Sequence, residues 1–235
     1  MPGHETDDLA FQFVIFYKHK DMQSKKIHLA LKRVGDVLVS SLIIIVLFVI
    51  PVFEIIFIAI KLTSKGPAIF KQRRVGKDKK IFLMYKFRTM IVEHFDKDGK
   101  EIMSEDRITS IGRILRKLSL DELPQLFNIL NGTMSIIGPR PMLDYQAERC
   151  TEEENGRFAM RPGMTGWAQV KGRNNIYWEE RIKYDLEYIR NYTIWFDIKI
   201  FFLSIVTVFK REGTEVKTEY RGVDRFSKAY KENVE

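Results

Sequence analysis

Residues 37–60 read VLVSSLIIIVLFVIPVFEIIFIAI, a run of 24 residues that is apolar except for Ser40, Ser41, Pro51 and Glu54. At about 1.5 Å per residue, a straight helix of this length would cross the roughly 30 Å hydrocarbon layer of a membrane. A buried core helix is the alternative, but a domain of this size has little room to surround such a segment on every side. The run therefore predicts a helical segment in contact with lipid.

The flanks of this run indicate how it meets the membrane. Lys32 and Arg33 precede it and Lys61 follows it, so both flanks are basic and the positive-inside rule favours keeping both ends in the cytoplasm. Pro51 removes a helical hydrogen bond and clashes with the preceding turn, which predicts a kink. We therefore favour a re-entrant helix–break–helix over residues 31–62, with a single membrane span as the alternative.

The composition of the whole chain narrows the classes of partner. The chain has 235 residues and a formal charge of +8, which indicates an anionic partner. Nucleic acid, an anionic membrane surface and phosphorylated small molecules all fit that charge. Hydrophobic residues make up 45% of the chain, so most of it should form a water-soluble body. The single cysteine, Cys150, excludes an internal disulfide and a cysteine-cluster metal site.

The patterning along the chain predicts an α+β fold that is mostly helical. Residues 1–30 read as a poorly structured or partly helical extension that precedes the membrane segment. Residues 63–210 should form a water-facing domain, and residues 211–235 a polar tail.

Several elements can be placed within the water-facing domain. Two short strand-like runs, Ala68–Phe70 and Ile81–Tyr85, predict a small β element. Apolar residues recur at helical spacing over Ile111–Leu130 and over Trp178–Tyr192, which predicts two amphipathic helices. The apolar stretch Tyr192–Phe209 fits either a core element or a helix that lies in the membrane interface.

The segment with the most chemistry is RKLSLDELPQLFNILNGTMSIIGPRP, residues 116–141. Asp121 and Glu122 are adjacent at a predicted helix start, where backbone N–H groups and the helix dipole favour negative charge. A purely local role is the alternative, because Ser119-x-x-Glu122 matches a capping box and Pro124 suits a first helical turn.

The neighbouring cations favour a chemical role for the two acids. Arg116 precedes them, and Arg140 follows between two prolines that restrict its backbone. Guanidinium groups match phosphate oxygens in bidentate fashion, although each arginine taken alone also fits a solvated surface charge. Beside such groups Asp121 would stay ionised and face an electrophilic phosphorus. Glu122 could then hold Mg²⁺, which binds through one or two carboxylates plus substrate phosphates.

Four strings resemble the bacterial sugar transferase family, the monotopic polyprenyl-phosphate phosphoglycosyl transferases. They are KFRTM (86–90), LRKLSLDELPQLFNIL (115–130), MSIIGPRP (134–141) and RPGMTGWAQVKGRN (161–174). The similarity extends over residues 30–210 and keeps the motifs in the family's order, including the apolar segment with its internal proline.

The resemblance implies a two-step transfer on this chain. Asp121 would attack the sugar-bearing phosphate of a UDP-sugar and release UMP, and polyprenyl (undecaprenyl) phosphate would then take the phosphosugar from Asp121. Glu122 would help to bind Mg²⁺, and Arg116 and Arg140 would contact phosphates. The resemblance also implies that residues 63–210 form a cytoplasmic catalytic domain.

Further expectations follow from the same resemblance. The protein would sit in the bacterial inner membrane among its lipids, with its other helices lying along the membrane face, and a homodimer is allowed. Secondary candidates for phosphate contacts are Lys86 and Arg88, with surface charge as the alternative. Candidates for the nucleotide side are Gly163, Thr165, Gly166 and Gln169, with a tight structural turn around a buried Trp167 as the alternative.

Two other classes of function are less consistent with the sequence. A membrane-surface adaptor would explain the charge and the apolar run, but not the paired acids between arginines. We expect no nucleic acid partner, because the basic residues are scattered and do not line one helix or alternate with stacking aromatic residues.

Overall fold

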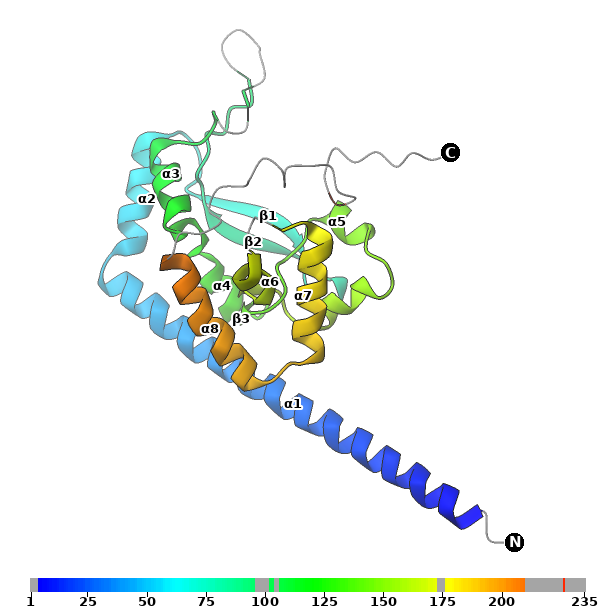
Figure 1. The fold of residues 1–235 in the computed structure, drawn as a ribbon. Coiled ribbons are helices and arrows are strands. Elements are labelled where there is room, and N and C mark those ends of the chain that lie inside the picture. Colours follow the sequence, from blue (N-terminus) through cyan, green and yellow to red (C-terminus); the bar gives the residue numbers. More distant parts are fainter. Residues whose placement is uncertain (1–3, 96–101, 104–105, 173–175, 210–225, 227–235) are drawn as a thin grey trace, which may run out of the picture.

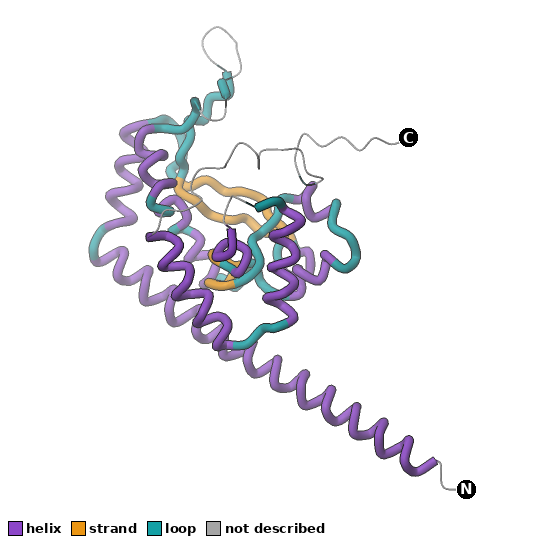
Figure 2. The backbone as a smooth tube through the Cα atoms, in the orientation of Figure 1, coloured by secondary structure: helices purple, strands orange, loops and turns teal. Residues whose placement is uncertain are grey.

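A computed structural model describes residues 4–95, 102–103, 106–172, 176–209 and 226, with side chains for those of them from 26 to 207 and for 226. Helices dominate these residues and surround two small two-stranded sheets (Figures 1 and 2). The prediction of a mostly helical fold with a small β element is confirmed. The predicted polar tail over 211–235 lies outside the described residues except for Phe226, which is buried.

Two helices, α1 (His4–Val49) and α2 (Val52–Thr63), form a bent pair along one side of the molecule (Figure 1). The axes of Lys26–Val49 and α2 differ by 64°, and Pro51 lies in the break as the sequence led us to expect. No single helix in the described part of the chain is long and apolar enough to cross a membrane, whereas the pair is by length and composition alone. Helix α1 also begins far earlier than predicted, inside the expected N-terminal extension.

One face of the bent pair packs against the rest of the protein, and another face is exposed. Ile44, Phe53 and Ile60 are buried against the domain. On other sides of the same two helices, Val49 and Leu62 are 77% and 82% exposed. An apolar surface that protein does not cover indicates contact with an apolar surrounding.

Strands β1 (Ile69–Val75) and β2 (Ile81–Phe87) form an antiparallel hairpin around the one-turn helix η1 (Lys77–Lys79). Both strands are longer than the sequence predicted. Residues opposite one another share a face of the hairpin, and so do residues two apart along a strand. The pairing of Arg74 with Phe82 and of Phe70 with Lys86 therefore places both cations on the face that carries buried Phe82.

The single helix predicted over residues 111–130 is wrong. The chain instead forms α3 (Ser110–Lys117), the 3₁₀ turn η2 (Leu120–Glu122) and α4 (Gln125–Leu130). Ser119 has a φ of 56°, a left-handed conformation that ends α3. Its side chain makes no capping hydrogen bond, so the predicted capping box is also wrong. Residues 120–122 form a separate turn because the left-handed backbone of Ser119 breaks the helical geometry.

A second, parallel pair of strands lies under the loop that contains Arg140. It consists of β3 (Ser135–Ile137) and β4 (Gly163–Thr165). A Cβ atom at Gly163 would lie 2.1 Å from Gly138 N, so this close approach requires glycine. The short helices that follow are α5 (Asp144–Glu148), η3 (Glu154–Ala159) and α6 (Trp167–Gly172).

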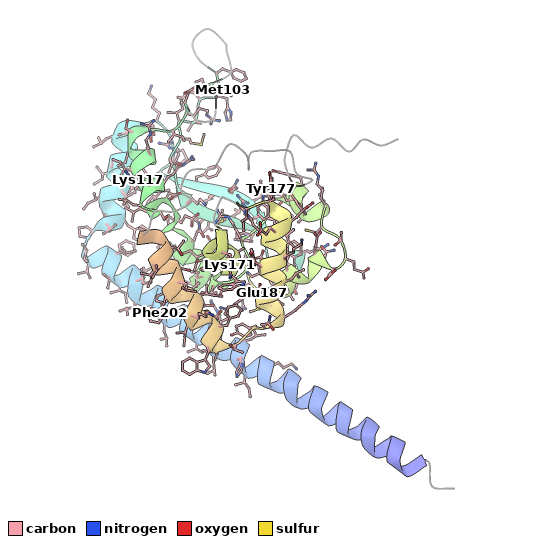
Figure 3. All side chains as sticks on the ribbon, viewed as in Figure 1. Met103, Lys117, Lys171, Tyr177, Glu187 and Phe202 are labelled. Carbon is pink, nitrogen blue, oxygen red and sulfur yellow. The ribbon has the colours of Figure 1, made fainter. Side chains whose placement is uncertain are left out.

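Helix α7 (Trp178–Arg190) confirms the amphipathic helix predicted there. Helix α8 (Ile194–Phe209) then packs on α6 and β3, and it crosses α1 in the view of Figure 1. Lys32 Nζ donates to Asp197 Oδ2 over 2.6 Å and ties these two helices together. Helix α8 has a buried side and an exposed side: Ile200 is fully buried, whereas Phe202 is 62% exposed (Figure 3). The exposed side leaves the predicted interfacial position of this helix a prediction.

Candidate active site

The adjacent acids Asp121 and Glu122 lie in η2, the isolated turn between α3 and α4. Both are partly buried, and η2 packs against strand β2. The left-handed Ser119 before the turn and Pro124 after it keep η2 separate from both helices. The two carboxylates are therefore presented by one short turn, beside the face of the hairpin that carries Lys86.

Glu122 is held by cations from two distant parts of the chain. Lys86 Nζ donates to Glu122 Oε1 over 2.7 Å, and Arg140 Nη2 lies 3.9 Å from the same oxygen. Burial by itself would raise the pKa of Glu122, but Lys86, Arg140 and a hydrogen bond with Gln125 outweigh it and lower the pKa. Glu122 is therefore an anion in the folded protein at neutral pH.

Asp121 behaves in the opposite way. Burial and the neighbouring charge of Glu122 raise its pKa, and this effect exceeds the opposing effect of Lys86 and Arg116. Lys86 and Arg116 by themselves would lower the pKa of Asp121, but burial and Glu122 have the larger effect, and the net change is a rise. Two adjacent acids with pKa values displaced in opposite directions are a common feature of sites where carboxyl groups have different roles.

Arg116 reaches the site from the last turn of α3. Its Nε donates to Thr89 Oγ1 over 2.8 Å, which orients the guanidinium group and leaves its other N–H groups available. The close packing of α3 on this segment depends on Gly112, where a Cβ atom would lie 2.1 Å from Thr89 O. The helix is thus brought near enough for Arg116 to act on Asp121.

Arg74 also belongs to the site, and the sequence did not identify it. Its Nη1 donates to Pro141 O over 3.1 Å, and Nε and Nη2 donate to Gln72. Burial and the charge of Arg140 lower the pKa of Arg74 to about 10, against the opposite influence of anions that include Glu122. The predicted strand ended before Arg74; a longer strand with alternating faces would have indicated that this arginine points inward.

The structure brings together Asp121, Glu122, Lys86, Arg116 and Arg140, but it places Arg88 elsewhere. The Arg88 side chain is buried and donates to Lys65 O over 2.6 Å and to Ser64 O over 2.8 Å. Among the described residues, no contact joins Arg88 to the two acids. A phosphate-binding role for Arg88 stays a prediction, while its hydrogen bonds secure the end of α2.

The four residues predicted for the nucleotide side lie around the loop that precedes Arg140. Gly163 and Gly166 pack against the backbone of Gly138, where a Cβ atom on either would lie 2.1 Å from it. Thr165 Oγ1 lies 2.7 Å from Ser204 Oγ, and Gln169 Nε2 donates to Met164 O over 3.4 Å. These contacts brace the loop, and contact with a nucleotide stays a prediction.

The site has part of what a magnesium ion needs. Within the ranges described, no group of three or more His, Cys, Asp and Glu side chains could hold a metal. Mg²⁺ usually binds through one or two carboxylates, waters and substrate phosphates. Asp121 and Glu122 fit the protein's share of such a site, so the remaining ligands would come from water and from the phosphates of a bound substrate.

Fold and site together define an α+β domain that presents a carboxylate pair among basic side chains, next to a bent apolar helix pair. The family model for bacterial sugar transferases matches residues 27–211, and the chain belongs to this family. The resemblance seen in the sequence motifs is confirmed.

Curated relatives agree with this assignment. A sugar transferase of Bacillus subtilis, EpsL, whose function is uncharacterised, is 41% identical over 197 residues, which cover 84% of this chain and 96% of the relative. The UDP-glucose:undecaprenyl-phosphate glucose-1-phosphate transferase of Escherichia coli is 44% identical over 74% of this chain and 39% of its own length. The undecaprenyl-phosphate galactose phosphotransferase of Salmonella typhimurium is 36% identical over 91% and 48%. The chain thus spans less than half of the two relatives that have a named reaction.

Proposed function

We propose that this protein transfers a sugar 1-phosphate from a UDP-sugar to polyprenyl (undecaprenyl) phosphate, with release of UMP. The reaction would be the first membrane step in assembling a surface polysaccharide or glycoconjugate. The reactions named for the E. coli and Salmonella relatives support this general reaction. The observation that carries the proposal is the cluster of cations at η2: Lys86 and Arg140 lie next to the Glu122 carboxylate, and Lys86 and Arg116 act electrostatically on Asp121.

In the first step a carboxylate oxygen of Asp121 attacks the phosphorus that bears the sugar. A P–O bond forms to Asp121, the P–O bond to UMP breaks, and UMP leaves with the bonding electrons. Arg116 and Arg140 offset the charge that gathers on the phosphate oxygens. The raised pKa of Asp121 fits a more basic and hence more nucleophilic carboxylate, provided that the pH keeps it ionised.

In the second step an oxygen of polyprenyl phosphate attacks the same phosphorus. The acyl phosphate bond to Asp121 breaks, which restores the carboxylate and gives a polyprenyl diphosphosugar. A covalent intermediate lets the water-soluble donor and the lipid acceptor use one site in turn. The donor and the acceptor then need not be bound at the same time.

Glu122 is the residue proposed to hold Mg²⁺, with Asp121 beside it. The bound ion would neutralise charge on the substrate phosphates and orient them. Lys86 and Arg140 keep Glu122 ionised in its partly buried position, which is the form that a metal ligand requires.

The bent pair α1–α2 supports a location at the bacterial inner membrane. We infer that it enters one leaflet and returns, with both ends and the catalytic domain on the cytoplasmic side. The uncovered apolar side chains of the pair, such as Val49 and Leu62, would then contact lipid. This arrangement would hold the acceptor's phosphate at the level of the site.

The test uses purified full-length protein, undecaprenyl phosphate, Mg²⁺ and a panel of UDP-sugars, with UMP release as the readout. We expect one or a few sugars to release UMP, and a labelled phosphosugar to be trapped on Asp121 and located by mass spectrometry when the acceptor is omitted. No UMP from any donor would refute the transferase proposal. A label on another residue would refute the role of Asp121.

A further inference from the structure

A buried ion pair lies behind the loop that carries Arg140. Arg157 in η3 and Asp185 in α7 have side chains that are 1% and 2% exposed. Arg157 Nε donates to Asp185 Oδ2 over 3.2 Å, and Arg157 Nη2 bonds to the same oxygen. Burying an ion pair of this kind contributes little net stability, so its presence calls for another explanation.

The same guanidinium group also binds the backbone of the site. Arg157 Nη2 donates to Arg140 O over 2.8 Å, so one side chain connects Asp185 to the residue that faces Glu122. The guanidinium carbon of Arg157 lies 5.5 Å from the ring centroid of Phe158 and 5.8 Å from that of Trp178, which restricts its movement.

Asp185 is also the counter-charge for the cations gathered here. Burial raises its pKa, while Arg157, Arg181 and Arg140 act in the opposite direction. Arg140 itself lies close enough to Arg74 for the two cations to repel. Arg157 neutralises the charge of Asp185, so the effect of Asp185 on Arg140 passes through the hydrogen bond from Arg157 to the Arg140 carbonyl.

We propose that Arg157 and Asp185 are positioning residues for Arg140, holding its loop so that its guanidinium group faces Glu122 and the phosphates of the donor. Asp185 fixes Arg157, and Arg157 fixes the Arg140 carbonyl between Pro139 and Pro141. A carbonyl held in this way limits the directions that the Arg140 side chain can take. This inference rests on the proposed function, because both readouts use the proposed donor or its UDP part.

The test is a double-mutant cycle in the full-length protein with Asp185→Asn and Arg140→Gln. Donor kcat/KM is measured by UMP release, and the Kd for UDP by calorimetry. We expect Asp185→Asn to lower kcat/KM about tenfold and to weaken UDP binding, and to have no further effect in the Arg140→Gln background. Losses that multiply in the double variant would mean that Asp185 does not act through Arg140, and would overturn the proposal.

The matched control is Arg190→Gln. Arg190 lies on the same helix as Asp185 and pairs with Glu153 over 2.6 Å, but both side chains are exposed. It should leave kcat/KM and UDP binding unchanged. Arg157→Lys keeps the charge but loses the planar fork, so it should reproduce the Asp185→Asn phenotype.

If thermal unfolding shows that Asp185→Asn lowers the folded fraction, Arg157→Lys replaces Asp185→Asn in the double-mutant cycle with Arg140→Gln. If Arg157→Lys has the same kcat/KM as the wild type, the proposal is overturned. If the wild type releases UMP from no donor, the proposed function fails. If the wild type releases UMP and binds UDP while Asp185→Asn and Arg157→Lys both keep its kcat/KM and its Kd for UDP, the positioning role alone fails.

Discussion

Lys86 Nζ lies 2.7 Å from Glu122 Oε1, and the same ammonium group opposes the rise that burial and Glu122 cause in the pKa of Asp121. One cation from strand β2 therefore acts on both acids of η2. The lysine reaches them because it shares the inward face of the hairpin with Phe82, while η2 packs on β2. This relationship makes the ionisation of the two acids depend on a residue about 35 positions away in sequence.

Replacing Lys86 by Met should shift the acid limb of the pH–rate profile to higher pH. Loss of the positive charge raises the pKa of both Asp121 and Glu122, so both carboxylates become protonated at a higher pH as the solution is acidified. The measurement is kcat/KM for the donor against pH. Lys71→Met, on the exposed side of the same hairpin, serves as the control and should keep the wild-type profile. An unshifted profile in Lys86→Met would contradict the coupling.

The two acids should differ when each is replaced by its amide. Asp121→Asn removes the proposed nucleophile, so turnover and the trapped phosphosugar should both disappear. Glu122→Gln removes a proposed metal ligand and should lower kcat by about 100-fold to 1,000-fold, with a higher Mg²⁺ concentration needed for half-maximal rate. An unchanged Mg²⁺ titration would exclude Glu122 as a ligand.

Arg74→Gln should lower donor kcat/KM by about tenfold to a hundredfold, the effect of losing one charged hydrogen bond to a phosphate. Arg74 donates to Pro141 O and lies close enough to Arg140 for the charge of Arg140 to lower its pKa, so its guanidinium group is near the proposed phosphate site. Arg73→Gln is the matched control, because Arg73 is adjacent but lies on the other face of β1 and is 65% exposed. Equal losses in both variants would indicate a general charge effect on the donor.

The re-entrant arrangement predicts that Lys26→Cys and Lys65→Cys, each in a Cys150→Ser background, react with a membrane-impermeant maleimide only from the cytoplasmic side. Lys26 lies in α1 ahead of its apolar run and Lys65 lies just after α2, and both are exposed. Labelling is measured in inverted and in right-side-out membrane vesicles. Labelling of one position from the periplasmic side would instead establish a membrane span.

Local sequence was sufficient for part of this protein. The long apolar run and Pro51 predicted a bent helix pair, and two strand-like runs predicted a small β element, because both features follow from the conformational preferences of neighbouring residues. The motifs around Asp121 and Glu122 identified the family, which the family model then confirmed. The same local reasoning failed at Ser119, because its left-handed conformation interrupts a continuous helical pattern of apolar residues.

Only the tertiary structure decided which charged side chains share the site. The sequence treated Lys86 and Arg88 alike, yet β2 directs Lys86 to Glu122, while the buried guanidinium of Arg88 binds the end of α2. Arg157 and Asp185 gave no sequence signal, since they meet through the packing of η3 on α7. Apolar periodicity is read from adjacent residues, but the partner of a charge is set by long-range packing. The sequence of this protein therefore determined its bent apolar segment, its two acids and the neighbouring Arg116 and Arg140, whereas the fold separated Lys86 from Arg88 and added Arg74.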